Sequence, residues 1–309
     1  MTEQPHIPVL LNEVLEYLNC QEAGVYVDGT FGAGGYTRAI LNANISNKVY
    51  AFDRDPSVWE TAEKFKKEYG ERFVFIADCF GNVLNHISEK VDGFVLDIGV
   101  SSMQIDKPER GFSFRFDGPL DMRMAQNGIS AREVVNMFSE QELADILYKY
   151  GEERASRRIA RMLVQERLKH PIITTKQLAD LVHKVMPKPK DGSDSAMRTF
   201  QALRIFVNDE LGELERALES SFDLLATGGR LVVVTFHSLE DRIVKNFLIQ
   251  NSALKPNGNR HMVKGYEPLR KYDFEVATKK AVKPSETELK HNSRAHSAKL
   301  RCGIRLEGL

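Results

Sequence analysis

The feature that most constrains the fold is a repeated pattern in the first hundred residues. Short apolar segments, several of which end in an acidic residue, alternate with helical segments. The segments with the strand pattern are 24–28, 48–53, 73–76 and 93–97. Strands that alternate with helices predict βαβ units and a parallel sheet. The sequence therefore predicts an α/β fold, with a doubly wound, Rossmann-like sheet.

A long interval interrupts this pattern. The next predicted strand is 230–236, so 132 residues separate Asp97 from Arg230. One crossover helix at 209–225 accounts for only a small part of them, and the remainder is far longer than a loop in a compact domain.

The patterns inside the interval are helical. Three pairs have the spacing of a capping box, in which a Ser or Thr is followed three residues later by Glu or Gln. They are Ser130 with Glu133, Ser139 with Glu142, and Thr174 with Gln177. We therefore predict a discontinuous core, residues 1–112 and 206–309, with an inserted all-helical domain at 113–205.

Composition places the chain among globular proteins of a reducing compartment. Hydrophobic residues make up 42% and charged residues 28% of the chain, and no apolar run approaches the roughly 20 residues that span a bilayer. The three cysteines are scattered, which predicts neither a disulfide framework nor a metal site. We expect a cytoplasmic protein without a membrane partner; the sequence leaves a homodimer open.

The charge is balanced overall but uneven along the chain. Residues 1–100 carry 8 Lys/Arg against 15 Asp/Glu, whereas residues 255–305 carry 13 Lys/Arg against 5 Asp/Glu. A basic segment of this kind indicates a polyanionic partner, although a solvated basic surface would give the same count.

The glycine-rich turn at 29–35 indicates the kind of cofactor. Such turns bring backbone N–H groups close to a ligand. Gly32 and Gly34 are followed by Thr37 where the dinucleotide fingerprint has a third glycine, which disfavours a nicotinamide cofactor. With Asp28 before it, the turn resembles the first motif of S-adenosylmethionine-dependent methyltransferases. The resemblance implies that Asp28 helps to hold the ammonium of the cofactor, directly or through water.

Three further residues fit the same cofactor. Asp53 ends the second strand, where a carboxylate can accept both ribose hydroxyls. Phe80 follows the third strand, where methyltransferases commonly contact adenine, although a core aromatic is the alternative. Asp97 ends the fourth strand, where it can contact the methionine portion or the acceptor amine; a helix-capping role is the alternative.

Several longer motifs resemble one family closely, the bacterial 16S ribosomal RNA cytosine-N4 methyltransferases of the MraW type. They occur in order along nearly the whole chain: HIPVLL at 6–11, DIGVSS at 97–102, RGFSF at 110–114, DGPLDMRM at 117–124, TFQALR at 199–204, FHSLEDR at 236–242 and RAHSAKLR at 294–301. The resemblance implies a class I methyltransferase core interrupted by a helical domain. It also implies methylation of a decoding-centre cytosine in the small ribosomal subunit.

By this resemblance, the residues that contact S-adenosylmethionine are Gly34, Gly35, Tyr36, Asp53, Phe80, Asp97 and Gln104. One departure concerns the acceptor amine. Many amino-group methyltransferases have Asp/Asn-Pro-Pro-aromatic after the fourth strand, and this chain has Asp97-Ile98-Gly99-Val100.

The chemistry predicts two catalytic candidates and an RNA-binding surface. Asp97 can accept hydrogen bonds from the amine, and His237 is a candidate proton acceptor or base-edge contact unless it is structural. Aromatic residues that stack bases and basic residues that hold phosphates are the candidates for RNA. They are Phe112, Phe114, Arg154, Arg157, Arg158, Arg161, Arg294 and Arg301.

Two other functions stay open at this point. A methyltransferase that acts on a protein or small molecule would not need the basic segments. A non-catalytic RNA-binding assembly factor would not need Gly34, Asp53 and Asp97 intact.

Overall fold

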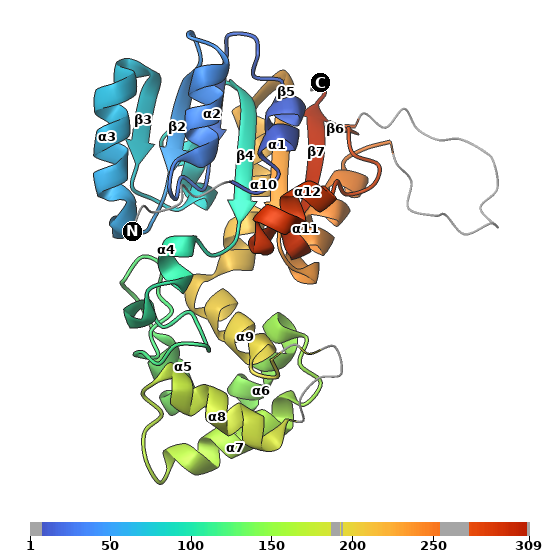
Figure 1. Cartoon of the computed structure of the whole chain (residues 1–309). Helices are drawn as coiled ribbons and strands as arrows, with labels where there is room; N and C mark the ends of the chain where they lie inside the picture. Colours follow the sequence, from blue (N-terminus) through green and yellow to red (C-terminus); the bar gives the residue numbers. More distant parts are fainter. Residues whose placement is uncertain (1–7, 187–191, 193, 254–271, 308–309) are drawn as a thin grey trace, which may run out of the picture. The chain divides into compact units, whose positions relative to one another are not determined.

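A computed structural model describes residues 8–186, 192, 194–253 and 272–307 (Figure 1). The chain forms two compact units, of which the first combines Met1–Gly99 with Gly212–Leu309 and the second is Val100–Leu211. Part of the basic segment at 255–305 lies outside the described residues, as do His6 and Ile7 of the first motif.

The first unit contains a sheet whose order, among the described residues, is β3-β2-β1-β4-β5-β7-β6 (Figure 1). The strands from β3 to β5 in this order are parallel, β7 is antiparallel to β5, and β6 is antiparallel to β7. This is the doubly wound α/β fold that the sequence predicts. The strands are β1 Val25–Asp28, β2 Lys48–Phe52, β3 Phe73–Ile76, β4 Val91–Ile98, β5 Leu225–Thr235, β6 Phe274–Val276 and β7 Lys299–Arg305.

Helices pack on both faces of this sheet because alternate strand residues point to opposite faces. Val27, Phe94 and Val233 join the apolar side chains of α10 and α11 in one buried cluster. Tyr26 points to the other face, where its ring and Leu18 of α1 lie against Gly93. The helices of this unit are α1 Leu11–Leu18, α2 Gly35–Ala43, α3 Trp59–Tyr69, α10 Glu210–Leu224, whose first turn contains the division between the units, α11 Ser238–Gln250 and α12 Glu286–His291.

The second unit is built from helices around its own apolar core. Leu143, Ile159 and Leu203 are fully or almost fully buried there, on three different helices. The three capping boxes predicted at 130, 139 and 174 are confirmed, and they begin α5, α6 and α8. The helices are α4 Ser102–Ile105, α5 Ala131–Met137, α6 Glu140–Gly151, α7 Ser156–Arg167, α8 Thr175–Val185 and α9 Met197–Asn208.

The helical unit is longer at both ends than the predicted 113–205. Phe112 precedes that range, yet it packs in the helical core. At the other end α9 continues to Asn208, whose side-chain amide donates to the Met122 carbonyl at 2.7 Å and accepts from the Met124 amide at 2.8 Å. These contacts tie the flanking residues to the helical unit.

Within the described part of the chain, no helix combines the length and the apolar character that a membrane span requires.

Candidate active site

The turn between β1 and α2 requires glycine at Gly34 for two reasons. Its φ is +80°, a conformation that L side chains rarely adopt, and an added Cβ would lie 2.4 Å from the Phe65 ring. At Gly35 an added Cβ would lie 2.2 Å from Pro8. The chain therefore passes tightly into α2, whose first backbone N–H groups have no partner within the helix.

Asp28 organises this turn from the end of β1. The residue is fully buried, and its two carboxylate oxygens accept hydrogen bonds from the Thr30 amide at 3.1 Å and the Thr37 hydroxyl at 2.7 Å. Burial raises the pKa of Asp28. Because both oxygens already have donors within the protein, this geometry favours a structural role over direct contact with an ammonium group.

Asp53 lies just beyond β2 and holds the same turn from the other side. Its Oδ2 accepts a hydrogen bond from the Gly32 amide at 2.8 Å, and its Oδ1 accepts one from the Asp55 amide at 2.8 Å. Burial raises the pKa of Asp53 to about 6, although these two bonds oppose the rise. Asp53 also has a donor on each oxygen, but unlike the fully buried Asp28 it is only half-buried. Its carboxylate thus lies beside the glycine turn, where the ribose contact is predicted.

Asp97 lies near the end of β4, the strand beside β1. Its backbone amide donates to the Thr30 hydroxyl at 2.8 Å. Its Oδ1 is buried and has no hydrogen-bond partner among the described residues. Burial, together with the charges of Asp28 and Glu240, raises the pKa of Asp97 to about 7, and the nearby Tyr36 hydroxyl offsets only part of this rise.

The two aromatic candidates of the first unit flank the turn. Phe80 begins a short 3-10 helix, and its Cβ lies 3.0 Å from the position of a Cβ added to Gly29. Tyr36 is buried, and its hydroxyl donates to the Val9 carbonyl. Because the hydroxyl already donates its proton to Val9, we expect Tyr36 to contact a ligand through its backbone or its ring.

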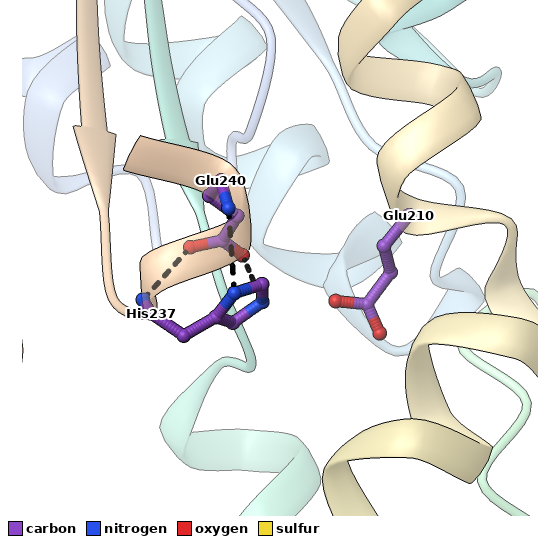
Figure 2. A group of neighbouring side chains, drawn as sticks. All are labelled: Glu210, His237 and Glu240. Carbon is purple, nitrogen blue, oxygen red and sulfur yellow. Dashed lines mark hydrogen bonds and ion pairs between the residues drawn. The ribbon is translucent and has the colours of Figure 1, made fainter. Parts of the chain in front are cut away.

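His237 is the N-cap of α11, a role that sequence reasoning missed (Figure 2). Its Nδ1 accepts from the Glu240 amide at 3.4 Å, and its Nε2 lies 2.9 Å from Glu240 Oε1. Glu240 Oε2 in turn accepts from the Phe236 amide at 2.7 Å and the His237 amide at 3.2 Å.

This reciprocal cap has a chemical consequence. Nδ1 already accepts from a backbone amide, and Nε2 is buried facing Glu240 Oε1, although neither Nε2 nor Oε1 has a hydrogen-bond partner among the described residues. The geometry favours the structural interpretation of His237 over the predicted catalytic one. It also identifies Glu240, which is fully buried, as a residue that shapes the surroundings of Asp97.

The first unit therefore brings Asp28, Asp53, Asp97 and Glu240 to the carboxyl edge of its sheet. The charged groups that raise the pKa of Asp97 are the carboxylates of Asp28 and Glu240. Carboxylates grouped in a buried site repel one another and favour protonation. A positively charged ligand would relieve this repulsion, so the electrostatics of the site fit a cationic cofactor.

Gln104 belongs to the second unit. It is buried in α4, and its Oε1 accepts from the Ser101 amide at 3.1 Å. Its predicted contact with the cofactor stays a prediction.

The predicted RNA-binding residues occupy different surroundings. Phe112 is buried in the helical core, and Phe114 packs edge-on against Phe200, so both rings have packing partners inside the unit. Arg301 is also buried, and its Nε donates to Asp241 at 2.7 Å. These placements weigh against Phe112 and Arg301 as RNA contacts, because Phe112 packs in the core of the second unit and Arg301 is hydrogen-bonded to Asp241 in the first.

Four of the predicted arginines do lie on a surface. Arg154, Arg157, Arg158 and Arg161 are exposed at or within α7. Arg161 pairs with Glu140 at 3.4 Å, an exposed contact of the kind that contributes little to stability. Arg294 lies half-buried in the 3-10 helix Ser293–Ser297.

Comparison with known proteins decides the family. The model of the MraW methylase family matches residues 3–305. The chain belongs to the MraW methylase family. It is therefore a methyltransferase, and its family agrees with the motifs that span the sequence.

Relatives of this MraW methylase match along almost their whole length. A protein from Paramagnetospirillum magneticum is 52% identical over 99% of this chain and 97% of its own, and one from Rickettsia bellii is 50% identical over 98% of this chain and all of its own. Both are named ribosomal RNA small subunit methyltransferase H. A solved rRNA methylase from Streptococcus thermophilus covers 99% of each chain at 13% identity with a TM-score of 0.43, too low to bear on function.

Proposed function

We propose that this MraW methylase transfers a methyl group from S-adenosylmethionine to the exocyclic N4 amine of a decoding-centre cytosine in 16S ribosomal RNA. The main observation behind the proposal is the environment of the Asp97 carboxylate. Its buried Oδ1 has no partner among the described residues, and the nearby carboxylates of Asp28 and Glu240 raise its pKa. Such an acceptor suits both a cationic methyl donor and the N–H groups of an amine.

The cofactor contacts follow from the first unit. Asp53 beside the glycine turn would accept the ribose hydroxyls, and Phe80 would cover a face of the adenine ring. The amides at Gly34, Gly35 and Tyr36 would approach the ligand closely, because the turn leaves room for no side chain at the two glycines. When bound, S-adenosylmethionine supplies an activated methyl group on a positively charged sulfur.

The amine requires help from the protein because its lone pair is delocalised into the cytosine ring. Asp97 would accept a hydrogen bond from an amine N–H group, which holds the nitrogen in line for attack. The same carboxylate stabilises the positive charge that develops on the nitrogen. The methylated amine is acidic in that state, so no strong general base is needed, in agreement with the capped ring of His237.

The proposed partner is the 16S RNA of the small ribosomal subunit. The relatives' names state a small-subunit rRNA methyltransferase, and the exposed arginines of α7 offer charge for phosphates. The N4 position and the decoding centre rest on the resemblance of the motifs at 97–102, 110–124 and 236–242.

Mass spectrometry of nucleosides tests the proposal directly. Small-subunit RNA from cells that lack this protein should contain an unmethylated cytosine that the purified protein and S-adenosylmethionine convert to N4-methylcytosine. A methyl group found on another base or on cytosine C5 would contradict the proposed acceptor. A labelled ribosomal protein in place of labelled RNA would favour the alternative protein substrate.

A further inference from the structure

A second concave region lies within the first unit, beside the candidate active site. It is a cavity of about 480 Å³, within the usual size range of ligand sites. Three segments line it: residues 236–238 at the start of α11, then Lys283, Pro284 and Leu289, and finally residues 296–299. None of its lining residues is among those proposed to contact the cofactor.

The sheet register gives the backbone separation of Lys299, which lines the cavity, from the residue that follows Asp97. Lys299 begins β7 and pairs with Thr235 of β5, and Thr235 pairs with Ile98 of β4, the residue after Asp97. Neighbouring strands lie about 4.8 Å apart, so Lys299 and Ile98 are separated by two strand spacings, about 10 Å. Adjacent nucleotides of one RNA strand can bridge a separation of this size.

The rim of the cavity is basic. Lys283 is exposed and has neither a hydrogen bond nor an ion pair with any other described residue. Lys299 lies 3.1 Å from Asp241, but the same carboxylate also pairs with Arg301 at 2.7 Å. Asp241 is therefore shared between Lys299 and Arg301, and Lys283 adds a positive charge at the rim. The two lysines of the lining suit an anionic group.

Apart from the two lysines, the lining combines apolar side chains with two histidines and two serines. Phe236, Pro284 and Leu289 contribute to the lining, and each is half-buried. A site with apolar walls and a basic rim matches a nucleotide, because the sugar or base covers the apolar surface while the phosphate meets the lysines. A free inorganic anion would make no use of the apolar walls.

We propose that this cavity binds the nucleotide adjacent to the methylated base, with Lys283 and Lys299 holding its phosphate. The proposal rests on the proposed function, because it assigns the cavity to the same RNA strand. The site would orient the strand so that the target base reaches Asp97, and it makes Lys283 a positioning residue.

Lys283→Ala tests the assignment, with Lys245→Ala as the matched control. Lys245 is an exposed lysine of α11 that does not line the cavity. Relative to the control, Lys283→Ala should raise KM for small-subunit RNA by roughly five- to tenfold and reduce the slope of log affinity against log salt by about one. The value of kcat and the affinity for S-adenosylmethionine, measured by calorimetry, should not change.

A second experiment tests the contact between Lys283 and the phosphate by replacing that phosphate with an uncharged linkage. A short cytosine-containing RNA is made with a methylphosphonate at one phosphate beside the target, and its binding to both proteins is measured by fluorescence anisotropy. The uncharged linkage should weaken binding to the unmodified enzyme but cause no further loss in Lys283→Ala, because the contact is already missing.

The outcomes separate the two proposals. If Lys283→Ala matches Lys245→Ala in KM, salt slope and methylphosphonate response while RNA is methylated normally, the cavity assignment is wrong and the proposed function stands. If the unmodified enzyme methylates no small-subunit RNA, the proposed function is wrong, and with it the assignment of the cavity to that strand.

Discussion

The side-chain hydroxyl of Thr30 accepts a hydrogen bond from the backbone amide of Asp97 at 2.8 Å. The amide of Thr30 donates to Asp28 at 3.1 Å. One threonine therefore links the ends of β1 and β4, and it fixes the acceptor carboxylate relative to the glycine turn.

Thr30→Val should loosen this link. Valine has a similar shape but cannot accept the hydrogen bond, so the Asp97 amide loses its partner, at a cost of about 1–3 kcal/mol in the free energy of unfolding. Chemical denaturation and single-turnover methylation measure the two effects. Thr30→Ser keeps the hydroxyl and should retain most of the stability and rate. Equal losses in the valine and serine variants would show that the hydroxyl is not what matters.

Asp53→Ala should weaken the binding of S-adenosylmethionine. The ribose hydroxyls lose a charged acceptor, a change of on the order of 1.5–3 kcal/mol in the binding free energy. Asp53→Asn keeps an acceptor for the Gly32 amide and separates the support of the turn from contact with the ligand. Calorimetry measures both affinities. An unchanged affinity of Asp53→Ala for S-adenosylmethionine, or tight binding of NAD by the unmodified protein, would contradict the cofactor assignment.

The stability of the ligand-free protein should depend on pH in an unusual direction. Asp97 and Asp53 have pKa values of about 7 and about 6 in the folded protein, against an ordinary value of 3.8. Between about pH 4 and 7 the folded state therefore binds more protons than the unfolded state, and the contribution of these groups to stability falls as the pH rises. Asp241 behaves in the opposite way, because its pairing with Arg301 and Lys299 lowers its pKa. Its contribution to the stability of the folded protein is lost only in stronger acid.

Denaturation at pH 5.5 and pH 8 checks this expectation. The ligand-free protein should lose stability between the two values, and Asp97→Asn should flatten the dependence. A cationic cofactor favours the ionised carboxylates, so its affinity should increase over the same interval, with proton release visible as a dependence of the binding enthalpy on the buffer. Binding without proton release would argue that Asp97 is already ionised in the free protein.

Binding of RNA should depend on the arginines of α7. Replacing Arg154, Arg157 and Arg158 by Ala should weaken binding and flatten its salt dependence, because each lost phosphate contact reduces counterion release. The affinity for S-adenosylmethionine should not change. A control variant replaces Lys64, Lys66 and Lys67, which are exposed on α3. Equal salt slopes in the two triple variants would mean that the α7 arginines are only a solvated surface.

Much of the α/β core was predictable because local signals agree there. The strand pattern at 73–76 and the glycine turn that leads into α2 match the structure closely. The capping boxes were found because Ser and Thr are common N-caps. His237 and Glu240 form the same kind of box, but histidine is not a usual N-cap, so the sequence does not reveal the box and presents His237 alone as a catalytic candidate.

Other features had no local signal. The sequence of β7, Lys299–Arg305, is rich in basic residues and indicated an RNA-binding tail. It is a strand because β5 pairs with it and Asp241 neutralises Arg301. Phe112 belongs to an irregular segment, where no periodicity distinguishes a core side chain from an exposed one. Glu240 lies near Asp97 because β5 is the neighbour of β4 in the sheet. A local sequence motif does not reveal which strands are neighbours.

Single-turnover methylation of purified small subunits by Asp97→Asn tests the central claim most directly. The variant keeps the shape of the side chain but replaces a carboxylate by an amide that also donates. If Asp97 aligns the amine and stabilises the developing charge, the rate should fall by roughly two orders of magnitude or more while RNA affinity hardly changes. A normal single-turnover rate in Asp97→Asn, at saturating S-adenosylmethionine and RNA, would contradict the assignment of Asp97 to the reacting centre.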